Sequence, residues 1–398
     1  MSVLAAGWVL PVSGAPIPGG RVAVAAGRVA WVGRTGDQGD PGGPVHDLGP
    51  GVLLPGLVNA HCHLELSHLG GQVPLEGGFV PWVEAVVEAR GRFADADVSE
   101  ATAAAIRSLE ERGTVAVGDV SNAVAHLGPL AASRLDAVVF QELLAWDPAR
   151  AEASLTWAEE RARAVAARLR PGIEVRLAAH APHSVSPALF ALLKERGGPR
   201  AIHLAESPAE SRFLLDGAGE WPAFLARRGL GHVAFDPPGT SPVRYLEDLG
   251  VLHPRLVAAH GVQTDAADRG VLARRGVHVV LCPRSNRNLG VGTADVPALL
   301  AAGVRLALGT DSRASADTLD VLDDAVLLHR QFPALDPAVI VRIATLGGAE
   351  ALGFAHLGTI APGRAAALAY AQATAVPEAP HDFLLSGEAR LGRVDVES

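Results

Sequence analysis

Two histidines spaced one residue apart, His61 and His63, end an apolar run within the segment 55–65. In an extended strand, residues i and i+2 point to the same face, so these imidazoles would project together while Cys62 points away. A pair of imidazoles on one side of a strand end is half of a metal site. Two histidines can also share a strand face without any ligand, so the chemistry depends on what the rest of the chain supplies.

Further polar residues follow other apolar runs: His180, His183, His203, Glu206, His260 and Asp311. Each alone could be a satisfied core residue or, for Asp311, a helix cap, but together they favour one shared site. With the first pair, His203 and Asp311 would complete a mononuclear site of three imidazoles and one carboxylate. Such a site suits one divalent metal per chain, most readily zinc although Fe²⁺ would also fit, and it keeps a position for water.

Two residues near these ligands could act on a water at the metal. Glu206 follows His203 by three residues and could carry protons between water and substrate, although a glutamate there could simply favour a helix N-terminus. His260 could hydrogen-bond the same water and orient it. Some barrel hydrolases bridge two metals with a carboxylated lysine at the end of their fourth strand. Here the fourth apolar run, 173–180, contains no lysine, and the only lysine of the chain, Lys194, lies in the helical pattern after it, which favours one metal.

The elements that must position these residues are eight apolar runs that alternate with amphipathic helical patterns. The runs lie at 52–61, 114–120, 135–144, 173–180, 201–205, 256–260, 277–282 and 304–309. Eight consecutive βα units predict an α/β fold, a (β/α)8 TIM barrel, whose active site lies at the carboxyl ends of the strands. A doubly wound open sheet would use the same elements but would give the polar strand ends no common centre.

Both chain ends contain short apolar runs separated by glycine and proline, which predicts short strands. We therefore expect a small β-sandwich domain built from 1–53 and 356–398, appended to a catalytic barrel over 54–355.

Composition limits the function classes. The chain has 398 residues, 49% of them hydrophobic, and a net charge of -9 with both signs interspersed. This pattern argues against a nucleic-acid surface or a basic membrane patch and favours small-molecule chemistry. The absence of a basic, apolar leader or a run of roughly 20 apolar residues predicts a cytoplasmic protein. The two cysteines, Cys62 and Cys282, lie in apolar runs, so a disulfide framework is not expected.

Four motifs resemble signatures of the amidohydrolase superfamily, in its deaminase and chlorohydrolase branch. They are Pro55-Gly-Leu-Val-Asn-Ala-His-Cys-His, His203-Leu-Ala-Glu, Val257-Ala-Ala-His-Gly-Val and Leu308-Gly-Thr-Asp-Ser. The likeness spans nearly the whole chain, and it implies the same barrel and the same metal ligands. One departure is Ala365-Ala-Ala-Leu, where relatives usually carry Ala-Asp-Leu. That position belongs to the appended sandwich, so its loss puts little chemistry in doubt.

A narrower resemblance concerns the substrate. The segments 63–67, 77–84, 242–251 and 282–288 are similar to the 6-amino-6-deoxyfutalosine deaminases of menaquinone biosynthesis, which act on a nucleoside that carries a benzoate. The resemblance implies hydrolytic deamination that yields futalosine and ammonia. Water oriented by His260 and Asp311 would attack the ring carbon bearing the amine, while Glu206 protonates the neighbouring ring nitrogen.

Several residues are candidates for binding this nucleoside. An arginine after the seventh run, Arg284 or Arg287, could bind the benzoate carboxylate through a guanidinium fork. Phe79 or Trp82 could cover an aromatic ring. Further candidates for contacts with the ribose, the base or the rest of the substrate are Glu65, His180, Ser285 and Asn286.

Other functions remain open. The chain could deaminate adenosine, methylthioadenosine or adenosylhomocysteine, or it could hydrolyse an amidated or chlorinated ring. Adenosylhomocysteine-type deaminases often keep a ribose-binding glutamate before the tryptophan of this loop, whereas here Pro81 precedes Trp82. A metal-binding scaffold that senses a ligand without turnover would need neither Glu206 nor His260. Barrels of this kind often form homodimers, and the sequence leaves the oligomeric state open.

Overall fold

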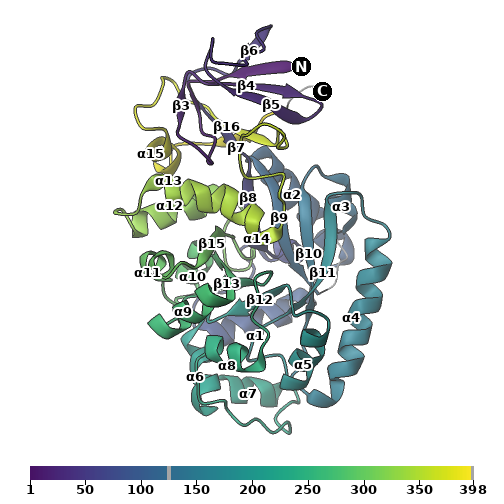
Figure 1. Cartoon of the computed structure of the whole chain (residues 1–398). Coiled ribbons are helices and arrows are strands. Elements are labelled where there is room, and N and C mark those ends of the chain that lie inside the picture. Colours follow the sequence, from purple (N-terminus) through teal and green to yellow (C-terminus); the bar gives the residue numbers. More distant parts are fainter. Residues whose placement is uncertain (123–126, 396–398) are drawn as a thin grey trace.

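The structure is a computed structural model that describes residues 1–122 and 127–395. A large α/β part carries a small all-strand part at one end, where both termini lie (Figure 1). Helices α6, α7 and α8 lie at the opposite end of the molecule (Figure 1). Among the described residues, no helix is both long and apolar enough to cross a membrane.

The large part contains two four-stranded parallel sheets. One sheet comprises β8 (Leu57–Cys62), β9 (Thr114–Ser121), β10 (Asp136–Leu143) and β11 (Ile173–Ala179). The other comprises β12 (Ala201–Leu204), β13 (Val257–His260), β14 (His278–Leu281) and β15 (Arg305–Leu308).

The two sheets meet at both edges. At one edge, the His203 amide donates to the His180 carbonyl at 2.8 Å, which joins β12 to the end of β11. At the other edge, the backbones of Cys62 and Asp311 form an isolated parallel β-bridge, and the Thr310 amide donates to the His61 carbonyl at 3.0 Å. These bonds close the cylinder, and the predicted (β/α)8 barrel is confirmed.

Helices follow the strands around the barrel. The α-helices are α1 (Phe79–Arg90), α2 (Asp95–Glu111), α3 (Leu127–Ala132), α4 (Ala151–Ala166), α5 (Pro187–Glu195), α6 (Pro208–Asp216), α7 (Trp221–Arg227), α8 (Pro242–Leu249), α9 (Ala266–Arg275), α10 (Pro283–Asn288), α11 (Val296–Ala301), α12 (Val321–Gln331), α13 (Pro337–Arg342), α14 (Gly348–Leu352) and α15 (Pro380–Leu385). Short turns of other helix types are η1 (Leu64–Leu69), η2 (Pro148–Arg150) and η3 (Ile343–Gly347).

Ser-Pro pairs begin three of these helices, α5, α6 and α8. The hydroxyls of Ser186, Ser207 and Ser241 accept from the backbone amide three residues on, and proline takes the first helical position. Helices α6, α7 and α8 all fall between β12 and β13. The alternation of apolar runs with helical patterns predicted helix there without bounds, and two Ser-Pro pairs mark the starts of α6 and α8.

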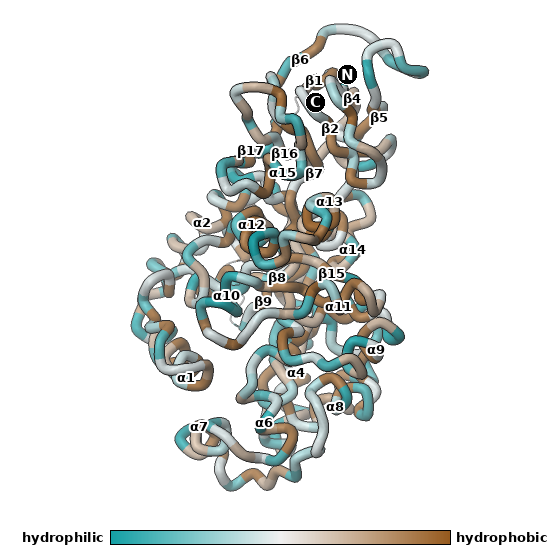
Figure 2. The backbone as a smooth tube through the Cα atoms, turned by 90° about the vertical axis from the view of Figure 1, so that its left-hand side faces the viewer, coloured by the Kyte–Doolittle hydropathy of each residue, from teal (hydrophilic) through white to brown (hydrophobic). Residues whose placement is uncertain are grey.

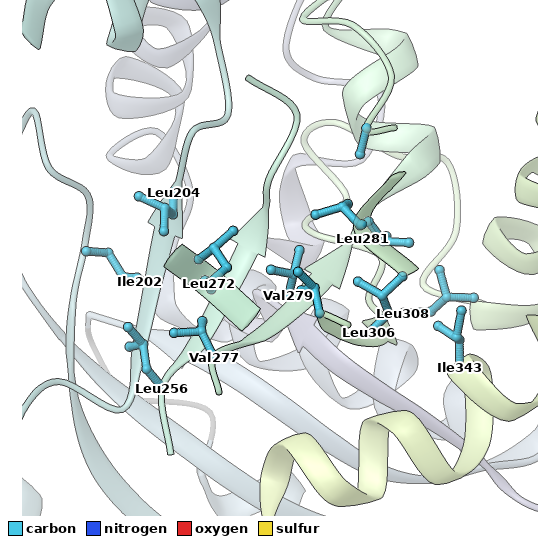
Figure 3. Packing of buried hydrophobic residues seen from close by; sticks show 14 of the residues in the cluster. Ile202, Leu204, Leu256, Leu272, Val277, Val279, Leu281, Leu306, Leu308 and Ile343 are labelled. Carbon is cyan, nitrogen blue, oxygen red and sulfur yellow. The ribbon is translucent and has the colours of Figure 1, made fainter. Parts of the chain in front are cut away.

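The two faces of the barrel strands carry different side chains. Leucine, isoleucine and valine on the outer face pack against the helices, and Figure 3 shows part of this cluster: Ile202, Leu204, Leu256, Val277, Val279, Leu281, Leu306 and Leu308 from the strands and the residues next to them, with Leu272 from α9 and Ile343 from η3. Alternate residues, such as Ala201, Val280 and Ala307, form a separate buried cluster. Because side chains alternate along a strand, His203 shares the face of Ala201. The surrounding helices carry both hydrophilic and hydrophobic stretches, as expected for helices covered on one side (Figure 2).

The small part contains two sheets. The first has the order β5-β4-β1-β6 and comprises β1 (Ser2–Ala5), β4 (Arg21–Ala25), β5 (Arg28–Gly33) and β6 (Val45–Asp47). The second has the order β17-β16-β7-β2-β3 and comprises β2 (Trp8–Val9), β3 (Ile17–Pro18), β7 (Val52–Pro55), β16 (Leu368–Ala371) and β17 (Leu391–Arg393). Strand β7 pairs with β16, so both chain ends contribute to one sheet.

The prediction of one strand over 52–61 is wrong. The run splits at Gly56 into β7, which belongs to the small sheet, and β8, which belongs to the barrel. A Cβ at Gly56 would lie 2.2 Å from the Val115 side chain, so glycine lets the chain pass against β9 at this crossing. The division into domains stays a proposal, with its first boundary moved from residue 53 to Gly56.

Candidate active site

Four side chains converge at the carboxyl ends of the barrel strands. One nitrogen each from His61, His63 and His203 and one oxygen from Asp311 all lie within 4.8 Å of one another. The His63 Nε2 atom lies 3.2 Å from His203 Nε2 and 3.4 Å from Asp311 Oδ1, and His61 Nε2 lies 3.8 Å from the same oxygen. These residues lie at the ends of β8, β12 and β15, so the structure brings together all four predicted metal ligands.

Hydrogen bonds behind the cluster orient its members. His203 Nδ1 lies 2.9 Å from the His180 carbonyl oxygen, which assigns the ring proton to Nδ1 and leaves the Nε2 lone pair facing the cluster. Asp311 Oδ2 accepts from the hydroxyls of Ser285 and Ser315, each at 2.7 Å, so Oδ1 faces the imidazoles. Neighbouring residues therefore fix the orientation of His203 and of Asp311.

This donor set fits a divalent cation. Two imidazole nitrogens 3.2 Å apart, with lone pairs directed at one point, repel each other unless a proton or a cation lies between them. Burial lowers the pKa of His63 to about 3 and the pKa of His203 well below its usual value, so a shared proton is disfavoured at neutral pH. The buried His61 Nε2 atom has no hydrogen-bond partner among the described residues. Three neutral imidazoles and a carboxylate are ligands that zinc accepts.

The backbone is strained at three of the strand ends. Ala205, His260 and Asp311 follow or end β12, β13 and β15 with φ values of 52°, 76° and 60°. Non-glycine residues seldom adopt this region, and such strain is common at functional sites. At β15 the strand end lies close against β8, because a Cβ at Gly309 would meet the His61 carbonyl oxygen at 2.7 Å. Glycine at 309 therefore permits the contact that joins Asp311 to His61.

Glu206 and His260 form a second group beside the cluster. His260 Nε2 lies 3.4 Å from Glu206 Oε1, and one atom from each residue lies within 4.8 Å of Asp311. His260 Nδ1 lies 2.9 Å from Asn286 Oδ1, which assigns the proton to Nδ1 and leaves Nε2 as an acceptor toward Glu206. Glu210 accepts from the Glu206 backbone amide at 2.7 Å and so holds the start of this turn.

Burial sets the protonation of this group. Burial, with smaller contributions from the charges of Asp311 and Glu210, raises the pKa of Glu206 well above its usual value. Burial lowers the pKa of His260 to about 4. Both pKa shifts favour the neutral form, a protonated carboxyl group for Glu206 and an uncharged imidazole for His260. A neutral carboxyl group in an active site can donate a proton to a substrate.

A cavity of about 360 Å³ opens above these residues, within the range for small-molecule sites. His63, Glu206 and Asp311 line its floor. Its aromatic walls come from α1, α7 and the segment after β10: Phe79, Trp82, Trp146, Trp221 and Phe224. The arrangement can position a ring beside a proton donor and a metal.

Four of the predicted substrate contacts line this cavity: Glu65, Phe79, Trp82 and His180. Ser285 and Asn286 are buried and bond instead to Asp311 and His260. Arg284 lies outside the cavity, where its guanidinium bonds to Asp324 at 2.8 Å and Asp317 at 2.9 Å and also to the 318–320 segment.

Three arginines that the sequence interpretation passed over line the cavity, and two of them, Arg150 and Arg228, are not bonded to Glu65 and Asn122 as Arg90 is. Arg150 follows β10 within η2, and Arg228 follows α7, where its guanidinium lies 5.7 Å from the centre of the Phe224 ring. In the part of the chain that the structure describes, neither guanidinium forms a hydrogen bond or ion pair. The position of Arg150 just after the third apolar run was the available signal, whereas Arg228 lies in a helical segment whose bounds the sequence interpretation did not give.

A (β/α)8 barrel with three histidines and an aspartate at the carboxyl ends of its strands defines a metal-dependent hydrolase. Residues 52–380 match the model of the Amidohydrolase family, so the chain belongs to this family. The predicted resemblance is confirmed: the chain is a hydrolase that acts on C–N bonds.

Several individual relatives are described as deaminases. The chain is 37% identical to an aminodeoxyfutalosine deaminase of Deinococcus radiodurans over 76% of this chain and 73% of the relative. It is 33% identical to a 5-methylthioadenosine/S-adenosylhomocysteine deaminase of Syntrophobacter fumaroxidans over 81% and 72%. Among solved structures, an adenosine deaminase from Xanthomonas campestris with bound zinc is 27% identical. It superposes with a TM-score of 0.82 over 98% of this chain and 89% of that one.

Proposed function

We propose that the chain catalyses metal-dependent hydrolytic deamination of an aminopurine nucleoside, specifically of 6-amino-6-deoxyfutalosine to futalosine and ammonia. The observation that carries the proposal is the Glu206–His260 pair, with 3.4 Å between its facing atoms, beside the three-histidine, one-aspartate cluster at the floor of an aromatic cavity. A site that only bound a metal or a ligand would need no buried proton donor there.

In this proposal His61, His63, His203 and Asp311 hold one divalent cation, with zinc as the best fit to the ligands. The bound cation would supply the Lewis acidity that makes water a nucleophile at neutral pH. His260 accepts a hydrogen bond from the attacking water through Nε2 and directs it toward the ring carbon bearing the amine. Ser285, Ser315 and Asn286 act only through Asp311 and His260, because they hold these side chains in position.

Glu206 moves the protons. As water adds to the ring carbon, the neutral Glu206 carboxyl group protonates the neighbouring ring nitrogen and then takes a proton from the water. The bond between carbon and the amine nitrogen breaks, and ammonia leaves with the second proton. The water oxygen stays on the ring, the original Glu206 proton ends on the ring nitrogen, one water hydrogen restores the Glu206 carboxyl group, and the other leaves on ammonia.

The outer cavity supports a substrate with an aromatic acid. Trp82, Trp146 and Trp221 offer flat apolar surface for a second ring. Arg150 and Arg228 supply positive charge at the same cavity, and we propose that they take over the carboxylate-binding role first expected of Arg284 or Arg287. A guanidinium can bind a carboxylate through two parallel hydrogen bonds.

A second candidate is deamination of methylthioadenosine or adenosylhomocysteine. The relative from Syntrophobacter fumaroxidans carries that description. The apolar cavity walls could also bind a thioether. Against this candidate, Pro81 offers no side-chain acceptor at the position before Trp82, where such deaminases often keep a ribose-binding glutamate.

The test measures ammonia released by the zinc-loaded protein from 6-amino-6-deoxyfutalosine, adenosine, methylthioadenosine and adenosylhomocysteine. We expect kcat/KM for the benzoate-bearing nucleoside to exceed the others by at least about 100-fold, because only it can pair with both arginines. Equal or higher values for the thioether nucleosides would favour the second candidate. Absence of ammonia from all four would contradict deamination of these nucleosides and leave a ring hydrolase or a ligand-sensing scaffold.

A further inference from the structure

A second buried carboxyl group lies beside the cluster with no role in the proposed reaction. Glu142 stands near the end of β10, lines the cavity and is 5% exposed. Its Oε2 atom accepts from the Asn122 side-chain amide at 2.7 Å. Its Oε1 atom is buried and has no hydrogen-bond partner among the described residues. A buried acceptor without a donor is costly, so the geometry calls for a donor that arrives with a ligand.

The neighbouring histidines do not supply that donor. Glu142 Oε1 lies 3.7 Å from His203 Nδ1, but the proton on this nitrogen points to the His180 carbonyl oxygen at 2.9 Å. The other nitrogen of His203 faces the His61 and His63 cluster. Glu142, His180 and His203 therefore cannot hold a second cation without taking His203 from the first site, although their ligand atoms lie within 4.8 Å.

A polar network holds Glu142 in place. Arg90 donates to Glu65 at 2.8 Å and to the Asn122 side-chain oxygen at 2.9 Å, and the Ser121 hydroxyl also donates to Glu65 at 2.6 Å. Glu65 is thus committed to protein donors, although it lines the cavity. Because the Asn122 side-chain amide donates to Glu142 Oε2, the same network also holds Glu142. Glu142 is therefore the pre-organised acceptor on this side of the cavity.

We propose that Glu142 Oε1 accepts a hydrogen bond from a hydroxyl of the nucleoside sugar, which makes Glu142 a specificity-determining residue for ribose. The inference rests on the proposed function. With the reacting carbon of the base beside Glu206 and His260, the sugar must occupy a neighbouring part of the same cavity, and its vicinal hydroxyls are donors that suit a carboxylate. Pro81, before Trp82, has no side-chain acceptor for them, so the chain meets this need from β10.

The experiment compares two substrates on two variants. The substrates are 6-amino-6-deoxyfutalosine and its 2′,3′-dideoxy analogue, and the readout is the ratio of their kcat/KM values. We expect the wild-type protein to favour the ribonucleoside by about 10- to 100-fold, because the dideoxy analogue would leave the buried Glu142 acceptor unpaired. Glu142→Ala should lower kcat/KM for the ribonucleoside by a similar factor and leave the dideoxy analogue within about twofold, so the ratio falls toward one. Asp147→Ala, which removes another carboxylate from the same cavity wall, should leave the ratio unchanged.

The possible outcomes distinguish failure of the sugar-binding role of Glu142 from failure of the proposed deaminase function. A ratio that stays at the wild-type value in Glu142→Ala would overturn the sugar-binding role, as would an equal loss with both substrates, which indicates a contact with the base or with His203. If the alanine variant fails to fold, Glu142→Gln keeps the side-chain size and should lower the ratio by a smaller factor; an unchanged ratio would overturn the role equally. No ammonia from wild-type protein with either substrate would contradict the proposed function itself, and this inference with it.

Discussion

The two ends of the barrel strands each have a cavity and a buried histidine, yet only one end resembles an active site. At the amino ends, His278 begins β14, is 3% exposed, and lines a cavity of about 820 Å³ together with Arg305 and Arg342. At the carboxyl ends, the cavity is less than half that size, but several imidazoles and carboxylates converge on its floor.

The difference between the two ends shows which features distinguish a candidate active site in this fold. Among the described residues, His278 belongs to no group of side chains that could hold a metal, and the one carboxylate that lines this cavity, Glu350, is paired with Arg342 at 3.1 Å. The carboxyl ends instead combine facing lone pairs, strained backbone and a raised glutamate pKa. Convergence of unsatisfied groups, and not burial or cavity size, distinguishes the two ends.

The strongest test of this comparison removes a ligand at the carboxyl end. Asp311→Ala should abolish metal binding and lower activity by at least about 1000-fold, because the only carboxylate of the cluster is lost. Elemental analysis would give metal per chain and an ammonia assay the activity. His278→Ala, at the other end, should keep its metal. One metal per chain in Asp311→Ala would remove Asp311 from the ligand set.

A smaller effect is expected from the groups behind the ligands. Ser285→Ala removes one of two hydroxyls that orient Asp311, and it should weaken metal affinity by about 10- to 100-fold. Competition with a chelator would measure the change. Ser312→Ala is the matched control, because the Ser312 hydroxyl has no hydrogen-bond partner among the described residues. Equal affinities of both variants would show that orientation by Ser285 contributes nothing.

The outer part of the same cavity should affect substrate choice without affecting the metal. Arg150→Ala and Arg228→Ala should each raise KM for the benzoate-bearing nucleoside by about 10-fold, because a charge-assisted bond is lost. KM for methylthioadenosine, which carries no carboxylate, should change by less than about twofold. Arg287→Ala removes an exposed arginine outside the cavity and should change neither value. If only Arg287→Ala raised KM, the substrate carboxylate would instead bind at α10, the helix after β14.

At the amino end the effect should be on stability and its pH dependence. Burial, assisted by Arg305, lowers the pKa of His278 to about 4, below its value in the unfolded chain. The stability that the neutral imidazole contributes is therefore present above about pH 6.5 and is lost as the pH falls toward 4. Between pH 7 and pH 4, the wild-type free energy of unfolding should fall by roughly 1–3 kcal/mol more than that of His278→Gln.

Denaturant unfolding at both pH values would measure this difference, and activity at pH 7 should stay within about twofold of wild type. Parallel pH curves for the two proteins would mean that His278 titrates alike in the folded and unfolded states. A large loss of activity would mean that the amino end has a part in catalysis.

The barrel and the convergence of the four candidate ligands could be predicted because they depend on local periodicity. Alternation along a strand places His61 beside His63 and His203 on the inner face, and parallel strands bring their carboxyl ends together. Arg284 shows the limit of such reasoning. Its partners Asp317 and Asp324 lie 33 and 40 residues away in the sequence, and only the folded chain reveals that they neutralise its charge.

The cavity walls were less predictable. Trp221 and Arg228 belong to a segment whose helices, α6 to α8, are short and lack a long apolar period. The apolar run around Gly56 shows a similar limit. It is continuous in the sequence, yet its two halves belong to two different sheets. In both places tertiary contacts, and not local pattern, decide the structure.

The most direct test of the central claim is ammonia release by Glu206→Gln loaded with one zinc per chain. Glutamine keeps the size of the side chain but cannot protonate the ring nitrogen or take a proton from water. The variant should retain its metal and substrate binding while kcat for 6-amino-6-deoxyfutalosine falls by at least about 1000-fold. A kcat within about tenfold of wild type, at equal metal content, would contradict the proton-transfer role of Glu206.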